Sequence, residues 1–173
     1  MSTDAALTEA GFGVFAEAGG PAPDYERLRV IASGIVPFAI HAGLEITEIG
    51  PERAVVAVPA GRERTNQMGT VHAGAQFLAA DVAGACAFVG AMAPRIGAVN
   101  WLVVRDAWST FRKPASGRVL AVATVEERPV RALLAGAATG AGRRFELDGK
   151  ATIQDEAGAP LAVFRFSYVG ELA

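Results

Sequence analysis

The pattern of hydrophobic and polar positions predicts one long buried helix among strands. From Ala73 to Met92 nearly every residue is apolar or small, and a helix that is apolar on all sides is normally a buried one. In residues 143–154 apolar and polar side chains alternate, which predicts a strand with one buried face and one wet face. Further elements are expected as a helix over 25–36 and as strands at 41–49, 53–59, 98–111, 119–125 and 161–169.

The order of these elements is a helix, two strands, the long helix and four strands. Runs of strands around one isolated helix favour an α+β fold with an antiparallel sheet, and a single long apolar helix requires a sheet that curls around it. Residues 126–142 fit either a helical turn followed by a loop or an irregular strand. Residues 1–24 are rich in Ala, Gly and Pro and are expected to be a loose tail. A single domain over 25–173 is therefore predicted.

Composition narrows the class of protein. The 173 residues are 51% hydrophobic and 20% charged, with a net charge of −2, which is typical of a soluble globular domain and gives no basic surface for nucleic acid. The lone cysteine, Cys86, excludes an internal disulfide, and Asp4 and Glu9 stand where a signal peptide carries basic residues. We therefore expect a cytoplasmic protein that is not inserted in a membrane. The absence of a second cysteine or a histidine cluster predicts no metal site.

Candidate chemistry is concentrated in residues 66–81, which read NQMGTVHAGAQFLAAD. Asp81 is the single carboxylate of the apolar helix. Aspartate is almost never fully buried unless it is paired, so we expect Asp81 either to have a partner or to face a cavity. The helix begins just after His72, and its first N–H groups are free donors at the positive end of the helix dipole.

The same stretch resembles the hotdog-fold acyl-CoA thioesterases, especially the phenylacetate-pathway type. The family motif reads roughly N-x-x-G-x-x-H-G-G with a carboxylate nine residues after the histidine, and the matching residues are Asn66, Gly69, His72, Gly74 and Asp81. Weaker matches are Phe111, Pro114 and Ala115 for an F-x-x-P-A element, and Asp155 and Gly158 for a D-x-x-G turn. The resemblance implies an antiparallel sheet of five to six strands wrapped around a central helix, and an acyl-CoA substrate without a separate cofactor.

Thioester hydrolysis needs a donor at the carbonyl oxygen and a base or nucleophile for the attack on carbon. The N–H of Ala73 or Gly74 is placed for the first role, and Asp81 for the second. Eight residues of helix separate Ala73 from Asp81 by about 12 Å, so one carbonyl cannot touch both. The sequence therefore predicts a site shared across a two-fold homodimer interface, with a dimer of dimers as a further possibility.

The remaining candidates have less specific roles. Asn66 is expected either in the catalytic site or as an ordinary turn former, and His72 more as a residue that holds the loop than as a base. The other expected substrate-binding residues are Gln67, Gly69 and Gly74, together with Arg112 and Lys113 for the phosphates of CoA, although solvated basic residues on loops are the simpler interpretation of the last two.

Two departures from the family motif keep other functions open. Ala73 replaces the first glycine after the histidine, and Val104 lies near a position where some relatives carry Ser or Thr. Both features favour an alternative, a non-catalytic acyl-CoA-binding or scaffold protein of the same fold. A hotdog-fold hydratase is less favoured, because His72 and Asp81 are about 13.5 Å apart along the helix axis.

Overall fold

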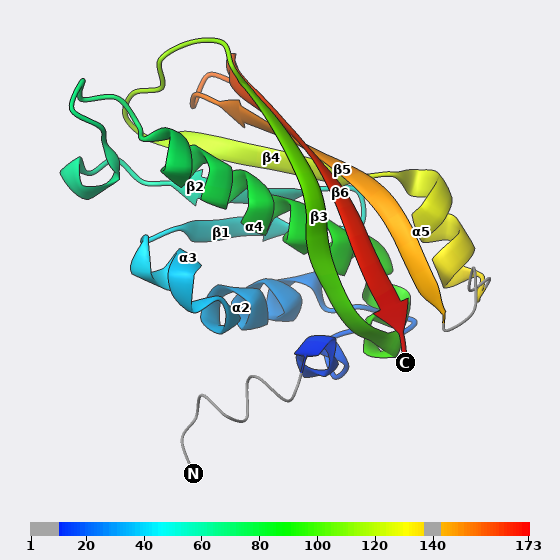
Figure 1. Ribbon diagram of the computed structural model, residues 1–173. Coiled ribbons are helices and arrows are strands. Elements are labelled where there is room, and N and C mark those ends of the chain that lie inside the picture. The colour runs from blue at the N-terminus through cyan, green and yellow to red at the C-terminus, as the bar shows by residue number, and fades with distance from the viewer. Residues whose placement is uncertain (1–10, 137–142) are drawn as a thin grey trace.

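A six-stranded antiparallel sheet curls around one long helix in the computed structural model, which describes residues 11–136 and 143–173 (Figure 1). The helices are η1 (Gly11–Phe15), α2 (Tyr25–Ile35), α3 (Pro37–His41), η2 (Arg62–Arg64), α4 (Ala73–Met92), η3 (Ala93–Ala98) and α5 (Glu127–Leu134). The strands are β1 (Glu45–Ile49), β2 (Ala54–Val58), β3 (Val99–Phe111), β4 (Val119–Val125), β5 (Arg144–Gln154) and β6 (Pro160–Leu172), in the sheet order β1-β2-β4-β5-β6-β3. The predicted α+β architecture is confirmed.

The core lies between α4 and the inner face of the sheet. Along β5, Phe145, Leu147, Ala151 and Ile153 are buried while their neighbours are more exposed, as the alternation predicts. Phe88 of α4 is fully buried and stacks on Phe145 with ring centroids 5.8 Å apart. The helical segment Ala73–Ala98 is also long and apolar enough to cross a membrane, since an 18-residue window within it has a mean hydropathy of 1.6, but 72% of that window is buried inside the protein. The apolarity of α4 is therefore explained by its place in the core.

The N-terminal segment differs from the predicted loose tail over the part that the structure describes. Phe15 is only 3% exposed, and the ring of Phe12 packs edge-on against Phe88 at 5.9 Å. The N–H of Gly20 donates to the carbonyl of Ala93 at 2.9 Å. Two aromatic side chains thus fix residues 11–24 to the C-terminal end of α4, although Gly and Pro dominate the local composition. Residues 1–10 lie outside the described part of the chain.

Two local features also refine the predictions. In β1 the pairing register shifts between Ile46 and Glu48, so that Ile46 and Ile49 are the buried pair, whereas strict alternation would place Glu48 on the face of Ile46. The ambiguous stretch after β4 begins with the two-turn helix α5, which buries Val130 and Leu133. Its residues 137–142 are outside the described chain.

Candidate active site

The loop before α4 is a closed turn organised by one side chain. The carboxamide oxygen of Asn66 accepts hydrogen bonds from the N–H groups of Met68 (2.9 Å) and Thr70 (3.2 Å). Its amide nitrogen donates to the hydroxyl of Thr70 at 2.9 Å. Gly69 supplies the left-handed position of the turn, with φ of 74°. Asn66 therefore shapes this loop, and its role in the chemistry stays a prediction.

Backbone and side-chain bonds fix the loop to the start of α4. The N–H of Val71 donates to the carbonyl of Ala115 (2.8 Å), and that of His72 to the carbonyl of Arg64 (2.8 Å). The side-chain amide of Gln76, buried to 4% exposure, donates to the carbonyl of Val71 at 3.0 Å. Sequence reasoning did not single out Gln76 or Arg64. The only signal was that Gln76 is the other polar residue of an otherwise apolar helix.

The structure distinguishes the two candidate donors at the helix N-terminus. The Nδ1 atom of His72 caps the helix by accepting from the N–H of Gly74 at 2.9 Å. The carbonyl of His72 accepts from Ala75 and Gln76. Within the described residues the N–H of Ala73 donates to no acceptor, and Ala73 is exposed. Ala73, rather than Gly74, thus carries the free donor of this helix end.

Asp81 lies halfway along α4 and is partly buried. It forms no hydrogen bond or ion pair with any residue that the structure describes, and burial raises the pKa of its carboxyl group. The carboxylate lines an apolar cavity of about 370 Å³ with Val82, Ala85 and Val89 of the same helix. Of the two expectations for this residue, a partner or a cavity, the cavity is the one found.

Two further ionisable groups surround Asp81 on the buried side. Burial, followed by the charge of Asp81, raises the pKa of the Cys86 thiol to about 12. The same two causes, in the same order, raise the pKa of Tyr168. The Tyr168 hydroxyl is buried against Gly84 and has no hydrogen-bond partner in the described structure. Both groups are neutral at pH 7, so neither supplies a positive charge that would pair with Asp81.

One subunit does not bring all the predicted residues together. The helix rise places Ala73 about 12 Å from Asp81. Gln67 and Lys113 are exposed and form no side-chain hydrogen bond with described residues. No group of three or more His, Cys, Asp or Glu residues in the described chain is arranged to hold a metal ion.

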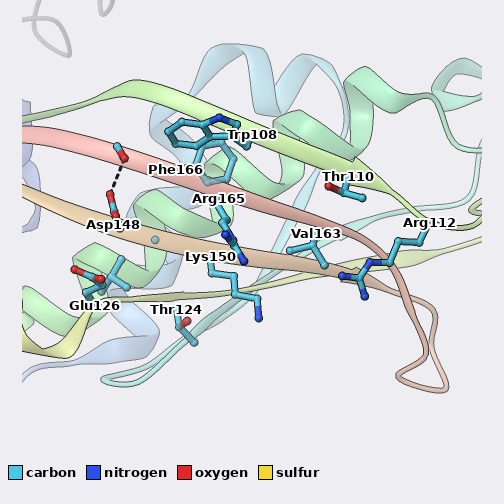
Figure 2. A pocket seen from close by; sticks show the side chains of 13 residues that line it. Trp108, Thr110, Arg112, Thr124, Glu126, Asp148, Lys150, Val163, Arg165 and Phe166 are labelled. Atoms are coloured by element: carbon cyan, nitrogen blue, oxygen red, sulfur yellow. Dashed lines mark hydrogen bonds between the residues drawn. The ribbon is translucent and has the colours of Figure 1, made fainter.

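Arg112 lies on the other side of the sheet from Asp81. It lines an open groove of about 760 Å³ on the outer face, with Lys150, Arg165 and Trp108 (Figure 2). Lys150 and Arg165 are directly opposite each other on β5 and β6, whereas the adjacent Phe164 and Phe166 are buried beneath them. A role for Arg112 in binding CoA phosphates stays a prediction, and it would require the substrate to reach around the β3 edge of the sheet.

The curled sheet, the central helix and the polar loop at its start define a hotdog-fold protein. The family profile of DUF4442, described as a domain of unknown function, matches residues 25–168, and the chain belongs to this family. A comparison with curated proteins gives no match.

Solved structures support the fold assignment. A Pseudomonas aeruginosa protein of unknown function, PA5026, described as a probable thioesterase, aligns with a TM-score of 0.72 and 22% identity over 90% of this chain and 99% of its own. The thioesterase HI1161 of Haemophilus influenzae aligns with a TM-score of 0.66 and 19% identity, covering 90% of this chain and 95% of its own. PaaI from the phenylacetic acid degradation operon of E. coli gives 0.56 and 19%, covering 83% and 92%. At these identities the likeness establishes the hotdog fold.

Proposed function

We propose that the protein hydrolyses an acyl-CoA, or a related acyl thioester, at a site shared by two subunits of a homodimer. The observation that carries the proposal is Asp81, a carboxylate without a partner among the described residues, which faces an apolar cavity from the middle of the core helix. A buried anion is costly, so its retention in an apolar helix favours a chemical role. The described function of HI1161 as a thioesterase on the same fold supports this reaction class.

The exposed edge of the sheet supports the shared site. β3 is a 13-residue strand at the edge of the sheet, and long apolar edges of this kind normally pair with another chain. Val104 and Phe111 on its inner face are 38% and 46% exposed, and Phe77 of α4 beside them is 39% exposed. Two-fold pairing of β3 edges would cover these side chains. It would also bring the start of α4 in one subunit toward Asp81 of the other.

The proposed reaction uses one group from each subunit. The N–H of Ala73 donates to the thioester carbonyl oxygen, where negative charge develops as the carbonyl carbon is attacked. Asp81 of the other subunit takes a proton from a water molecule, whose oxygen bonds to that carbon. The carbon–sulfur bond then breaks, and the proton passes from Asp81 to the departing thiolate. The products are a carboxylic acid and free CoA thiol, and Asp81 returns to its ionised form.

A second candidate function is acyl-CoA binding without turnover. It is favoured by the methyl group of Ala73, which lies beside the free N–H, and by Val104, which offers no hydroxyl to a water molecule. A hydratase is less well supported, because Nδ1 of His72 is occupied by the N–H of Gly74. The two leading functions differ in whether Asp81 is required for turnover.

The first test is hydrolysis of acetyl-, octanoyl-, palmitoyl- and phenylacetyl-CoA by wild type and Asp81→Asn, followed by thiol release. We expect kcat to fall at least about 100-fold in the variant, the usual scale for loss of a general base. Glu52→Gln is the control, since Glu52 is an exposed carboxylate in the turn between β1 and β2. A well-folded Asp81→Asn protein with wild-type turnover would exclude the mechanism, and a wild type inactive on every ester would favour the binding function.

The pH dependence gives an independent check. A general base acts only when deprotonated, and burial raises the pKa of Asp81 above the ordinary 3.8. The acidic limb of the kcat/KM profile should therefore have its midpoint above 3.8. The raised pKa also predicts that wild type loses stability, relative to Asp81→Asn, as the pH rises through the pKa of folded Asp81. Thermal melting across pH 4–8 measures that difference, and an equal stability gap at every pH would contradict it.

A further inference from the structure

The cavity beneath Asp81 has the form of a binding pocket for an apolar chain. It lies beside α4, with walls from α2 and the first residues of β3, and has a volume of about 370 Å³, within the range of small-molecule sites. Asp81 is the only charged residue among the described residues that line it. Apart from Asp81, Cys86 and Trp101, the lining residues have no polar side-chain atoms, so the complementary ligand is a hydrocarbon group with its polar end at Asp81.

The N-terminal segment supplies one wall of the cavity. Phe12 and Phe15 of η1 line it, and their rings pack at 6.0 Å from each other. Gly11, with φ of 47°, lets η1 approach β3 so closely that a Cβ would lie 2.9 Å from the carbonyl oxygen of Asn100. Figure 1 shows η1 beside the C-terminal end of α4 and the start of β3. We therefore treat the packed rings of Phe12 and Phe15 as the floor of the pocket.

Two quantities give the same size for the occupant. Asp81, Ala85 and Val89 line the cavity at successive turns of α4, which spans about 12 Å. An extended covalent chain advances about 1.2 Å per bond, as in a peptide of about 3.6 Å per three bonds, so about ten bonds fit this length. At about 30 Å³ for each water-sized group, the volume holds about twelve such groups.

We infer that this cavity holds the acyl group of the substrate, and that the preferred substrate is a medium-chain acyl thioester of about ten to twelve carbons. This inference rests on the proposed thioesterase function. The thioester lies at Asp81, the chain runs along Ala85 toward Val89, and Phe12 with Phe15 sets the length limit. Acyl selection thus takes place inside the subunit that supplies Asp81, whereas the carbonyl donor comes from the other subunit.

The test is kcat/KM for saturated acyl-CoA esters from acetyl to palmitoyl. Each buried methylene should raise kcat/KM about fourfold up to about ten to twelve carbons, with a fall beyond. Ala85→Leu fills the pocket one turn below Asp81, so the optimum should move to about four carbons, with acetyl-CoA turnover within about threefold of wild type. Ala91→Leu is the matched control, because Ala91 is on the same helix but lines a different depression, and it should keep the wild-type profile.

Phe12→Ala removes part of the floor and should move the optimum to longer chains, which keeps the inference testable if Ala85→Leu does not fold. An unchanged chain-length profile in folded Ala85→Leu and Phe12→Ala proteins would overturn the inference while leaving the thioesterase proposal intact. If no ester is hydrolysed, 1-decanol, which carries no charge to be repelled by Asp81, is titrated into a Trp108→Phe protein, in which Trp101 of the cavity wall is the remaining tryptophan. Saturable quenching that Ala85→Leu abolishes would support the pocket without the activity, and no quenching would overturn it.

Discussion

The two halves of α4 have the same small, apolar composition but lie in opposite environments. In the N-terminal half, Ala73 and Gly74 are exposed and Phe77 keeps over a third of its surface exposed. In the C-terminal half, Phe88 and Met92 are fully buried by η1 and the sheet. Because a helix that is apolar all round is normally covered on every side, the contrast indicates that this chain leaves one side of the N-terminal half uncovered, although Ala79 and Ala80 in that half are buried. The uncovered side is the part that we propose a second subunit covers.

The largest expected effect is on the buried half. Phe88→Ala should lower the free energy of unfolding by about 3–5 kcal/mol, because it leaves a cavity where the ring stacks on Phe145 and meets Phe12. Phe77→Ala should cost the isolated subunit only about 1–2 kcal/mol, since its ring is partly exposed and keeps edge contacts with Phe164 and Phe166. Urea denaturation at low protein concentration measures both.

The affinity of the dimer should depend on the exposed half of α4, where Phe77 lies. Phe77→Ala is expected to weaken the dimer at least tenfold by analytical ultracentrifugation, whereas Phe38→Ala, which removes an exposed ring on α3, should leave the dimer unchanged. A wild-type protein that is monomeric and fully active would refute the shared site and this interpretation of the comparison.

The regular elements could be predicted from the sequence because their patterns are local. The long helix from Ala73 to Met92 and the strand from Val119 to Val125 have the bounds that periodicity predicts. Pro94 follows the helix directly, and the alternation around Phe145 and Leu147 places the correct face of β5 in the core. For these segments hydrophobic period and breaker residues were sufficient.

The features that could not be predicted from the sequence depend on contacts between distant residues. Phe12 and Phe15 belong to a segment with no clear period, and only the end of α4 explains why they are buried. The choice between the N–H groups of Ala73 and Gly74 depends on where the ring of His72 turns. The position of Arg112 on the outer face follows from the register of β3 against β6, which includes two bulges. None of these can be worked out from local composition.

Glycine-to-alanine substitutions sharpen the comparison within the helix. A Cβ at Gly84 would lie 2.0 Å from the Tyr168 hydroxyl oxygen, so Gly84→Ala should destabilise the fold by about 1–3 kcal/mol through overpacking. In Gly74→Ala, the gain in helix propensity is offset by a tight contact with the ring of His72, and the net change should be within about 0.5 kcal/mol. Thermal or urea unfolding of both variants tests the contrast.

Tyr168→Phe supplies the control for Gly84. Its hydroxyl has no partner among the described residues, so the substitution alone should cost little, and it should recover most of the stability that Gly84→Ala loses. Additive losses in the double variant would show that the hydroxyl is not the clashing group.

The last prediction concerns His72, the residue that caps the exposed half of α4. His72→Ala removes the Nδ1 acceptor from the N–H of Gly74, and loss of a helix cap of this kind costs about 1 kcal/mol. His72→Asn should restore much of that stability, because asparagine is a favoured capping residue. The Ala73 donor and Asp81 are unchanged in both, so kcat should fall less than about tenfold in His72→Ala and recover in His72→Asn. A loss of about 100-fold or more in both variants, with stability restored only in His72→Asn, would instead make His72 a proton-transfer group. The uncovered end of α4 would then supply a catalytic side chain as well as a backbone donor.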